Sequence, residues 1–99
     1  MELELLPIGT VVELKNSTIP VMISGFLSVN RASKDKVWDY SGFKFPVGYS
    51  SDEDILSFDH SQIENILAYG YRDAQEMRFV KEVEGMRKEI AEKTKKEEN

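Results

Sequence analysis

The stretch Asn65–Val80, NILAYGYRDAQEMRFV, decides the fold, because the pattern of its apolar residues changes near Arg72. Before that point, apolar residues alternate or form short runs that Gly, Pro, Ser and Asn interrupt. After it there is no proline and only one glycine. Alternation is typical of strands, whereas a long uninterrupted pattern with helical spacing is typical of a helix. The sequence therefore predicts a β-rich body followed by a long helix.

The predicted helix has a recognisable start and an apolar stripe. Asp73 is a favourable N-cap residue, and Glu76 stands where its carboxylate can reach back to the free N–H of the cap. The stripe follows at helical spacing: Phe79, Val80, Val83, Met86 and Ile90. Gly85 interrupts the helix at a cost of ~1 kcal/mol relative to alanine. We expect the stripe to pack on the body, or to form a homodimer with a second copy of the chain.

The chain becomes highly charged after Met86. Residues 87–99 hold five basic and four acidic residues, and Ile90 is the only large apolar side chain among them. Such a segment has little to bury, so we expect its end to fray. The predicted organisation is a single β-rich domain over 1–86, which includes the first part of the helix. A charged helix end and a disordered tail are predicted over 87–99.

Alternation and turn residues predict five strands before the helix: Thr10–Lys15, Val21–Val29, Val37–Phe45, Asp54–Phe58 and Asn65–Tyr71. Pro20 cannot donate to a ladder, so it is expected at a strand start or edge. Asn30–Lys36 is expected to be a loop or hairpin end, and Ser61–Glu64 a capping box on a single helical turn. The fold class is α+β: a small antiparallel β-sheet or partly open barrel of about five strands, followed by a long C-terminal α-helix.

The second predicted strand has a clear apolar face. Alternation places four side chains on it: Val21, Ile23, Leu27 and Val29. Gly25 shares this face, which indicates a bulge or the close approach of another backbone.

The composition excludes several classes of function. The net charge is −5, and no basic stripe is present to bind nucleic acid or an anionic lipid surface. No cysteine is present, so neither a disulfide framework nor a thiolate zinc site can form. No apolar run reaches the length of a membrane span, and the N-terminal Met-Glu-Leu-Glu lacks the basic start of a signal peptide. We expect a cytoplasmic protein that binds neither nucleic acid nor membrane.

Catalytic and metal-binding groups are not evident in the sequence. His60 is the only histidine, and nothing indicates the nucleophile and orienting group that would make it catalytic. The acidic run Asp52-Glu53-Asp54 lacks the spacing of a calcium loop and is more typical of a solvated loop. The glycines are scattered, so no phosphate-binding loop is indicated. We expect a non-enzyme without a metal or cofactor.

Half of the ten aromatic residues fall in one stretch, Val37–Ile55. Alternation sends Trp38 and Tyr40 to one face of a strand, and Phe43 and Phe45 to the other. These rings are either core or part of an exposed surface that binds a partner protein. The candidates for partner binding are Trp38, Tyr40, Phe43, Tyr49 and Tyr71.

Four segments occur in the order and spacing of a known family: Leu5–Lys15 (LLPIGTVVELK), Val21–Phe26 (VMISGF), Trp38–Tyr49 (WDYSGFKFPVGY) and Phe58–Val80 (FDHSQIENILAYGYRDAQEMRFV). Over roughly residues 5–82 the chain resembles the small bacterial proteins classed as domain of unknown function 4176. The most specific parts are the opening Leu-Pro-Ile-Gly, the Asp-Tyr strand before a proline–glycine turn, and Gly70-Tyr71-Arg72-Asp73. The family has an acidic residue between that proline and glycine, where this chain has Val47.

The resemblance implies a partner protein rather than an enzyme. Proteins of this family are encoded in Gram-positive bacteria, often beside type VII secretion clusters and LXG-type polymorphic toxins. The role that the resemblance implies is a cytoplasmic accessory factor or chaperone for toxin export. Two alternatives stay open: an immunity protein that neutralises a toxin with its acidic face, or a structural or oligomerisation module.

Overall fold

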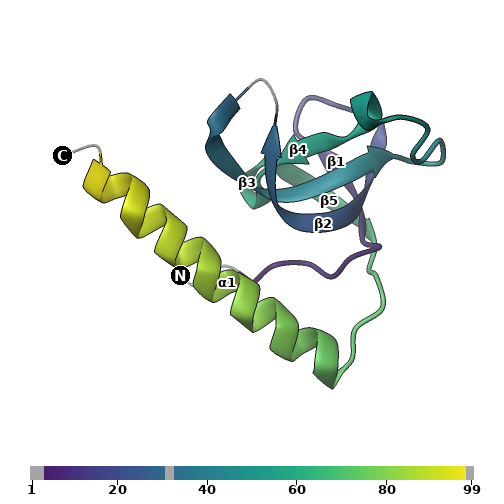
Figure 1. Cartoon of the computed structure of the whole chain (residues 1–99). Coiled ribbons are helices and arrows are strands. Elements are labelled where there is room, and N and C mark those ends of the chain that lie inside the picture. The colour runs from purple at the N-terminus through teal and green to yellow at the C-terminus, as the bar shows by residue number, and fades with distance from the viewer. Residues whose placement is uncertain (1–3, 31–32, 98–99) are drawn as a thin grey trace.

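The structure, a computed structural model, describes residues 4–30 and 33–97, with side chains for 4–29 and 36–93. It is an α+β fold in which one antiparallel sheet precedes one long helix, as the sequence predicts (Figure 1). The elements, where η marks a short 3₁₀ helix, are β1 (Val11–Leu14), β2 (Pro20–Asn30), β3 (Ser33–Lys44), η1 (Asp52–Asp54), β4 (Leu56–Phe58), η2 (His60–Gln62), β5 (Ile63–Ala68) and α1 (Ala74–Glu97).

The sheet curls so strongly that its two edges approach each other. Its strand order is β4-β3-β2-β1-β5, and each neighbouring pair is antiparallel. In a flat sheet the two outermost strands would lie about 19 Å apart. The chain connects them through residues 59–62 alone, which could span only about 18 Å even when fully extended. The sheet is therefore curved but open, with no ladder between β4 and β5 in the described chain.

The core fills the inside of this curl. The buried apolar side chains come from the N-terminal segment, from β1 to β4 and from the helix: Leu5, Leu6, Val12, Val21, Ile23, Tyr40, Phe58, Val80 and Val83. The N-terminal segment, residues 4–10, runs between α1 and the sheet (Figure 1). Helix and segment therefore close the inner face of the sheet together.

A bulge in β2 decides which of its side chains enter the core. The register with β3 shifts by one residue between Ile23 and Gly25, which confirms the bulge predicted at Gly25. The extra residue reverses the alternation, so that Phe26 packs against the core. Val29, which was predicted to face inward, is 57 % exposed for the same reason. Leu27 departs from regular strand geometry, with a positive φ of 53° that bulky residues rarely adopt, and it packs against the core as predicted.

α1 rests on the body along one side of the predicted stripe, and Phe79 at its edge lies 6.4 Å from the ring of Phe26. Val80 and Val83 are buried, whereas Phe79 and Met86 are each about half exposed. Arg87, four residues after Val83, turns inward and binds a carboxylate of β3. The predicted stripe is thus confirmed at Val80 and Val83, but the inward face is turned toward Arg87, because hydrophobicity alone does not show that a charged side chain has a partner in the body.

The start of α1 confirms one part of the predicted cap and corrects another. The backbone N–H of Glu76 donates to Asp73 Oδ1 at 2.8 Å, as expected of an N-cap residue. The carboxylate of Glu76 binds Arg72 instead of reaching back to the cap, and its two oxygens accept from the guanidinium at 2.7 and 2.9 Å. A bidentate, charge-assisted ion pair of this kind is stronger than a single hydrogen bond to a neutral backbone N–H.

Two predicted turns form near their expected positions. Residues 30–36, expected as a loop or hairpin end, lie at the end of the β2–β3 hairpin, where Asn30 pairs with Ser33; residues 31–32 lie outside the described part. The capping box sits on Asp59 and Gln62, before the predicted Ser61–Glu64, although a single helical turn does form there.

The last strand ends earlier than expected. β5 ends at Ala68, three residues before the predicted Tyr71. α1 continues to Glu97, within the segment 87–99 that was predicted as a charged helix end and tail, and 98–99 lie outside the described part.

Candidate partner-binding surface

Tyr40, one of the five predicted partner-binding residues, is a core residue. Its side chain is 0 % exposed, and its ring packs against Phe26 and Phe58 with centroids 6.1 and 5.4 Å away. A partner cannot reach it without opening the core. The aromatic residues of this stretch therefore do not all belong to one surface, because Tyr40 lies in the core.

The other four predicted residues lie in separate places. Trp38 is partly buried, and the ammonium group of Lys36 lies 4.1 Å from its ring centroid. Phe43 and Tyr49 pack edge to face at 5.5 Å, and Tyr49 is 60 % exposed. Tyr71 is 79 % exposed, after β5. The five residues do not form a single surface.

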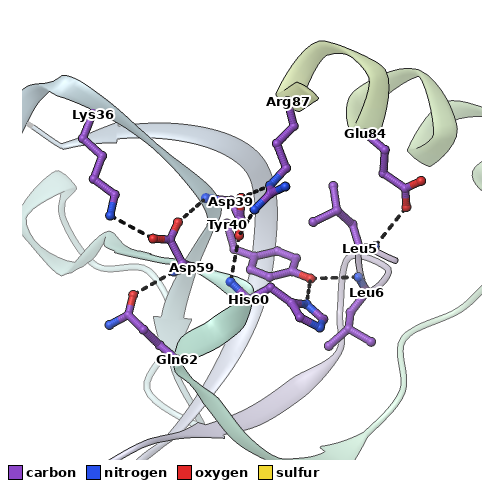
Figure 2. A network of polar contacts seen from close by, with 10 residues as sticks. All are labelled: Leu5, Leu6, Lys36, Asp39, Tyr40, Asp59, His60, Gln62, Glu84 and Arg87. Atoms are coloured by element: carbon purple, nitrogen blue, oxygen red, sulfur yellow. Dashed lines mark hydrogen bonds and ion pairs between the residues drawn. The ribbon is translucent and has the colours of Figure 1, made fainter. Parts of the chain in front are cut away.

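The hydroxyl of Tyr40 joins the N-terminal segment to the turn after β4. The backbone N–H of Leu6 donates to the Tyr40 oxygen at 3.0 Å, and His60 Nδ1 lies 2.7 Å from the same oxygen (Figure 2). The hydroxyl thus forms two hydrogen bonds, and the histidine tautomer sets which atom donates in the bond to His60. Burial raises the pKa of Tyr40 to about 12, so the phenol stays protonated as this arrangement requires.

Asp39 links α1 to the turn after β4 that contains His60. Its carboxylate forms an ion pair with Arg87 and accepts the backbone N–H of His60 at 2.9 Å (Figure 2). Asp39 is only 4 % exposed, so its charge is compensated almost entirely by these two donors. The backbone N–H of Asp39 donates to Asp59 at 3.1 Å, and Asp59 in turn pairs with Lys36 at 2.9 Å.

The helix also binds the backbone of the N-terminal segment directly. The N–H of Leu5 donates to Glu84 Oε1 at 3.0 Å, and the C=O of Leu5 accepts from Arg72 at 3.0 Å. Both polar backbone groups of this buried residue are thereby satisfied. Sequence reasoning missed this network, because its members have no common spacing and come from four distant parts of the chain.

His60 gives the network a pH dependence, and we expect the free energy of unfolding to fall as the pH drops below about 6.5. Burial is the main cause that lowers the pKa of His60; Asp39 and Arg87 act in opposite directions. The unfolded chain therefore binds this proton more readily than the folded one. The stability that neutral His60 contributes is fully present above the ordinary histidine pKa. This stability is lost as the pH falls through the lowered pKa of His60 in the folded state.

Urea unfolding at a series of pH values measures this effect. The matched variant is His60→Gln, which does not titrate, so that the difference between the two proteins isolates His60 from the carboxylates. A difference that stays constant from neutral pH downward would contradict the expected role of His60.

The outer face of the sheet carries an apolar row across four strands. We define the outer row as Phe43, Met22, Val11 and Ala68, which are successive cross-strand partners in β3, β2, β1 and β5. Directly opposed side chains lie within about 5.5 Å of one another, so the row is continuous. Phe43, Met22 and Val11 alternate with buried residues such as Val12, and α1 packs against that inner side, whereas Ala68 joins the row at a register shift between β1 and β5. The row thus lies on the face away from the helix.

Exposed rings and aliphatic groups extend the outer row at both ends. Tyr49 packs on Phe43 at one end. At the other end Tyr69, which follows Ala68, is among the most exposed apolar side chains. Ile8 is also half exposed, and its backbone lies against Gly70. Ser24 and Ser41, whose hydroxyl oxygens are 3.2 Å apart, give the adjoining part of β2 and β3 a polar character.

An acidic turn adjoins the Tyr49 end of the row. Tyr49 donates its hydroxyl to Asp52 at 2.9 Å, and Asp54 accepts from the backbone N–H groups of Ser50 and Ser51. A hydrogen bond from the Ser50 side chain is the largest cause that lowers the pKa of Asp54, which keeps this carboxylate ionised. The turn therefore holds a fixed negative charge beside an exposed aromatic ring.

Sequence reasoning found part of this surface and missed the rest. Phe43 and Tyr49 were predicted as partner-binding residues, but Met22 and Val11 were not. Their signal is present in the alternation, because each is apolar at a position between buried neighbours. What the sequence does not show is that the four strands align these residues into one row.

Other site chemistries find little support in the side chains that the structure describes. Among them no group of three or more His, Asp or Glu residues is arranged to hold a metal ion. None of the described helix has the length and apolar character needed to cross a membrane.

Comparison with known proteins places the chain in a family. No curated protein and no solved structure matches it. A family model described as domain of unknown function (DUF4176) matches residues 5–79. The matched region takes in the N-terminal segment, all five strands and the first part of α1. Since this is well over half of the sequence, the chain belongs to the DUF4176 family.

Proposed function

We propose that the protein is a non-catalytic, protein-binding accessory factor whose contact surface is the outer row with Tyr49 and Tyr69. The observation that carries the proposal is the continuity of apolar side chains across four strands on the face away from α1. Aromatic side chains that are exposed beside an apolar centre are the usual anchors of protein interfaces. Tyr40, Asp39 and His60 are engaged in holding the fold together, which leaves them without a role in binding.

The proposed client is a toxin of the LXG type, and the proposed task is to assist its export by type VII secretion from the cytoplasm. This part rests on the association that the family resemblance implies. A second candidate is an immunity protein that neutralises the toxin. The exposed acidic turn at Asp52–Asp54 and the net charge of −5 favour it, because an acidic surface can cover a basic active site.

The two candidates predict different partners in a pull-down. We expect the protein to retain the export region of the neighbouring toxin when that region is co-expressed without the catalytic region. Tyr49→Ala and Tyr69→Ala should each weaken retention by about tenfold, as loss of an aromatic anchor does. The melting temperature should hardly change, because both side chains are largely exposed.

The matched control is Met77→Ala, which removes a half-exposed apolar side chain from α1 instead. If the protein retains only the catalytic region of the toxin, the result would contradict the accessory role and favour the immunity protein. Equal retention by all three variants would contradict the proposed contact surface.

A further inference from the structure

We propose that the occupant of the outer row is a basic amphipathic segment of a partner protein, with apolar side chains on one side and lysine or arginine beside them. This inference rests on the proposed function and adds the chemistry of the partner to it. It follows from two properties of the surface, its apolar centre and the sign of the charge around it.

The apolar centre has the size and shape for one segment of chain. Four strands carry the row, so its centre is about 14 Å long. Phe43, Met22 and Val11 are half-buried, Tyr49 packs on Phe43 at one end, and the exposed Tyr69 follows Ala68 in the chain at the other. This is the length that about ten helical residues would cover. An apolar stripe on a single partner segment is therefore enough to cover the row.

The charge beside the row selects a basic partner. Glu13 stands next to Val11 in β1, on the same outer face as the row. Three acidic turn residues stand at the Tyr49 end: Asp52, Glu53 and Asp54. The nearby ammonium group of Lys44 already acts on Asp54, whose pKa it helps to lower. The free charge around the row is thus predominantly negative, which attracts cationic side chains and repels acidic ones.

Other occupants fit the surface less well. A nucleic acid has the wrong sign of charge for this rim. A second copy of the chain carries the same net charge of −5, and α1 has both signs of charge along its exposed side. A partner strand added at the free edge of β5 would form hydrogen bonds with backbone groups and would leave the outer row uncovered.

Two synthetic peptides test the chemistry directly. The first has about 18 residues with leucine on one helical face and lysine on the other, and the second has glutamate in place of every lysine. In fluorescence anisotropy, we expect the full-length protein to bind the lysine peptide at least about tenfold more tightly than the glutamate peptide. Raising NaCl from about 50 mM to about 500 mM should weaken the lysine complex, because salt screens exposed charges.

Four variants locate the binding site on the protein. Tyr49→Ala should lower the affinity for the lysine peptide by about tenfold. Glu53→Lys should lower it by at least about threefold and make it less dependent on salt. The matched controls on α1, Met77→Ala and Glu82→Lys, should leave binding unchanged. Both controls alter exposed side chains on a different element.

Several outcomes would overturn the inference. Equal affinity for the two peptides, or binding to neither, would contradict the claim that the surface selects a basic segment. Weakening by the α1 controls as strong as that by Tyr49→Ala would remove the outer row as the site. Sedimentation that shows a dimer broken by Tyr49→Ala would assign the row to a second copy of the chain. In each case the toxin pull-down can still succeed, which separates failure of this inference from failure of the proposed function.

Discussion

Gly70→Ala is expected to lower the free energy of unfolding by about 3 kcal/mol or more, since overpacking against a rigid backbone cannot be relieved locally. A Cβ atom at this position would lie 2.2 Å from the backbone oxygen of Ile8, 2.9 Å from the Thr10 nitrogen and 3.0 Å from the Gly9 carbonyl carbon. All three contacts are with backbone, so no side chain can rotate away.

The surrounding hydrogen bonds prevent an easy shift of the chain. The N–H of Gly70 donates to Thr10 Oγ1 at 3.0 Å, and Thr10 is completely buried. The N-terminal segment is held further along by the contacts of Leu5 and Leu6. Relief of the clash would have to break one of these bonds, which leaves a buried donor or acceptor unsatisfied.

Gly85→Ala is the matched control, because it is the same substitution in open space. Nothing lies within 4 Å of its added Cβ atom, and the residue is exposed in the middle of α1. We expect this variant to be more stable than the parent by about 1 kcal/mol, the difference in helix propensity. Urea unfolding of both variants measures the contrast. Similar stability changes in the two would show that the contact between Gly70 and the N-terminal segment is unimportant.

Tyr40→Ala is the second change with a large expected effect, a loss of about 3–5 kcal/mol in the free energy of unfolding. The ring is completely buried and packs against Phe26 and Phe58. Removing it leaves a cavity and also deprives the backbone N–H of Leu6 of its acceptor. Thermal or urea unfolding with a circular-dichroism readout measures the loss.

Tyr40→Phe separates the hydroxyl from the ring. It keeps the packing but leaves the Leu6 N–H unpaired, so we expect a smaller loss of about 1–2 kcal/mol. Tyr49→Ala removes a ring of the same size from the surface and should change stability by no more than about 0.5 kcal/mol. A loss at Tyr40 no greater than at Tyr49 would contradict the assignment of Tyr40 to the core.

Two of the family-specific motifs meet in the structure. Leu6-Pro7-Ile8-Gly9 and Gly70-Tyr71-Arg72-Asp73 contact each other through the close approach of Gly70 to the backbone of Ile8. Arg72 reaches the C=O of Leu5, and Asp73 caps α1. The most specific parts of the sequence therefore hold the N-terminal segment and the helix in place. Tyr71 is largely exposed, and its hydroxyl donates to the cap residue Asp73 at 3.1 Å.

The prediction of the strands failed where one residue changed the phase of alternation. Gly25 indicated the bulge correctly, but the side chains after it were still assigned as though alternation continued. Val29 was placed inside and Phe26 was not, whereas the structure has the opposite arrangement. A single extra residue shifts the alternation that follows it, which moved Phe26 inward and Val29 outward, whereas Leu27 with its positive φ still packs against the core as predicted.

The candidate surface could be predicted only in part. Alternation correctly set Phe43 on the face opposite Tyr40, yet both faces of that strand are apolar, and the sequence does not say which is covered. That choice depends on where α1 and the N-terminal segment pack. The same limit applies to Tyr40, which as a large aromatic residue suits a core as well as an interface.

The sequence by itself determined the fold class, the number and order of the strands, the cap of α1 and the family, because periodicity, turn residues and motifs are local properties of the chain. The tertiary structure alone decided which face of the sheet is buried, which side of α1 turns inward and which aromatic rings stay exposed. These depend on contacts between distant residues, such as Leu5 with Glu84 and Asp39 with Arg87, 79 and 48 positions apart. Such contacts form only when the sheet curls and the helix packs against it, so no local pattern encodes them.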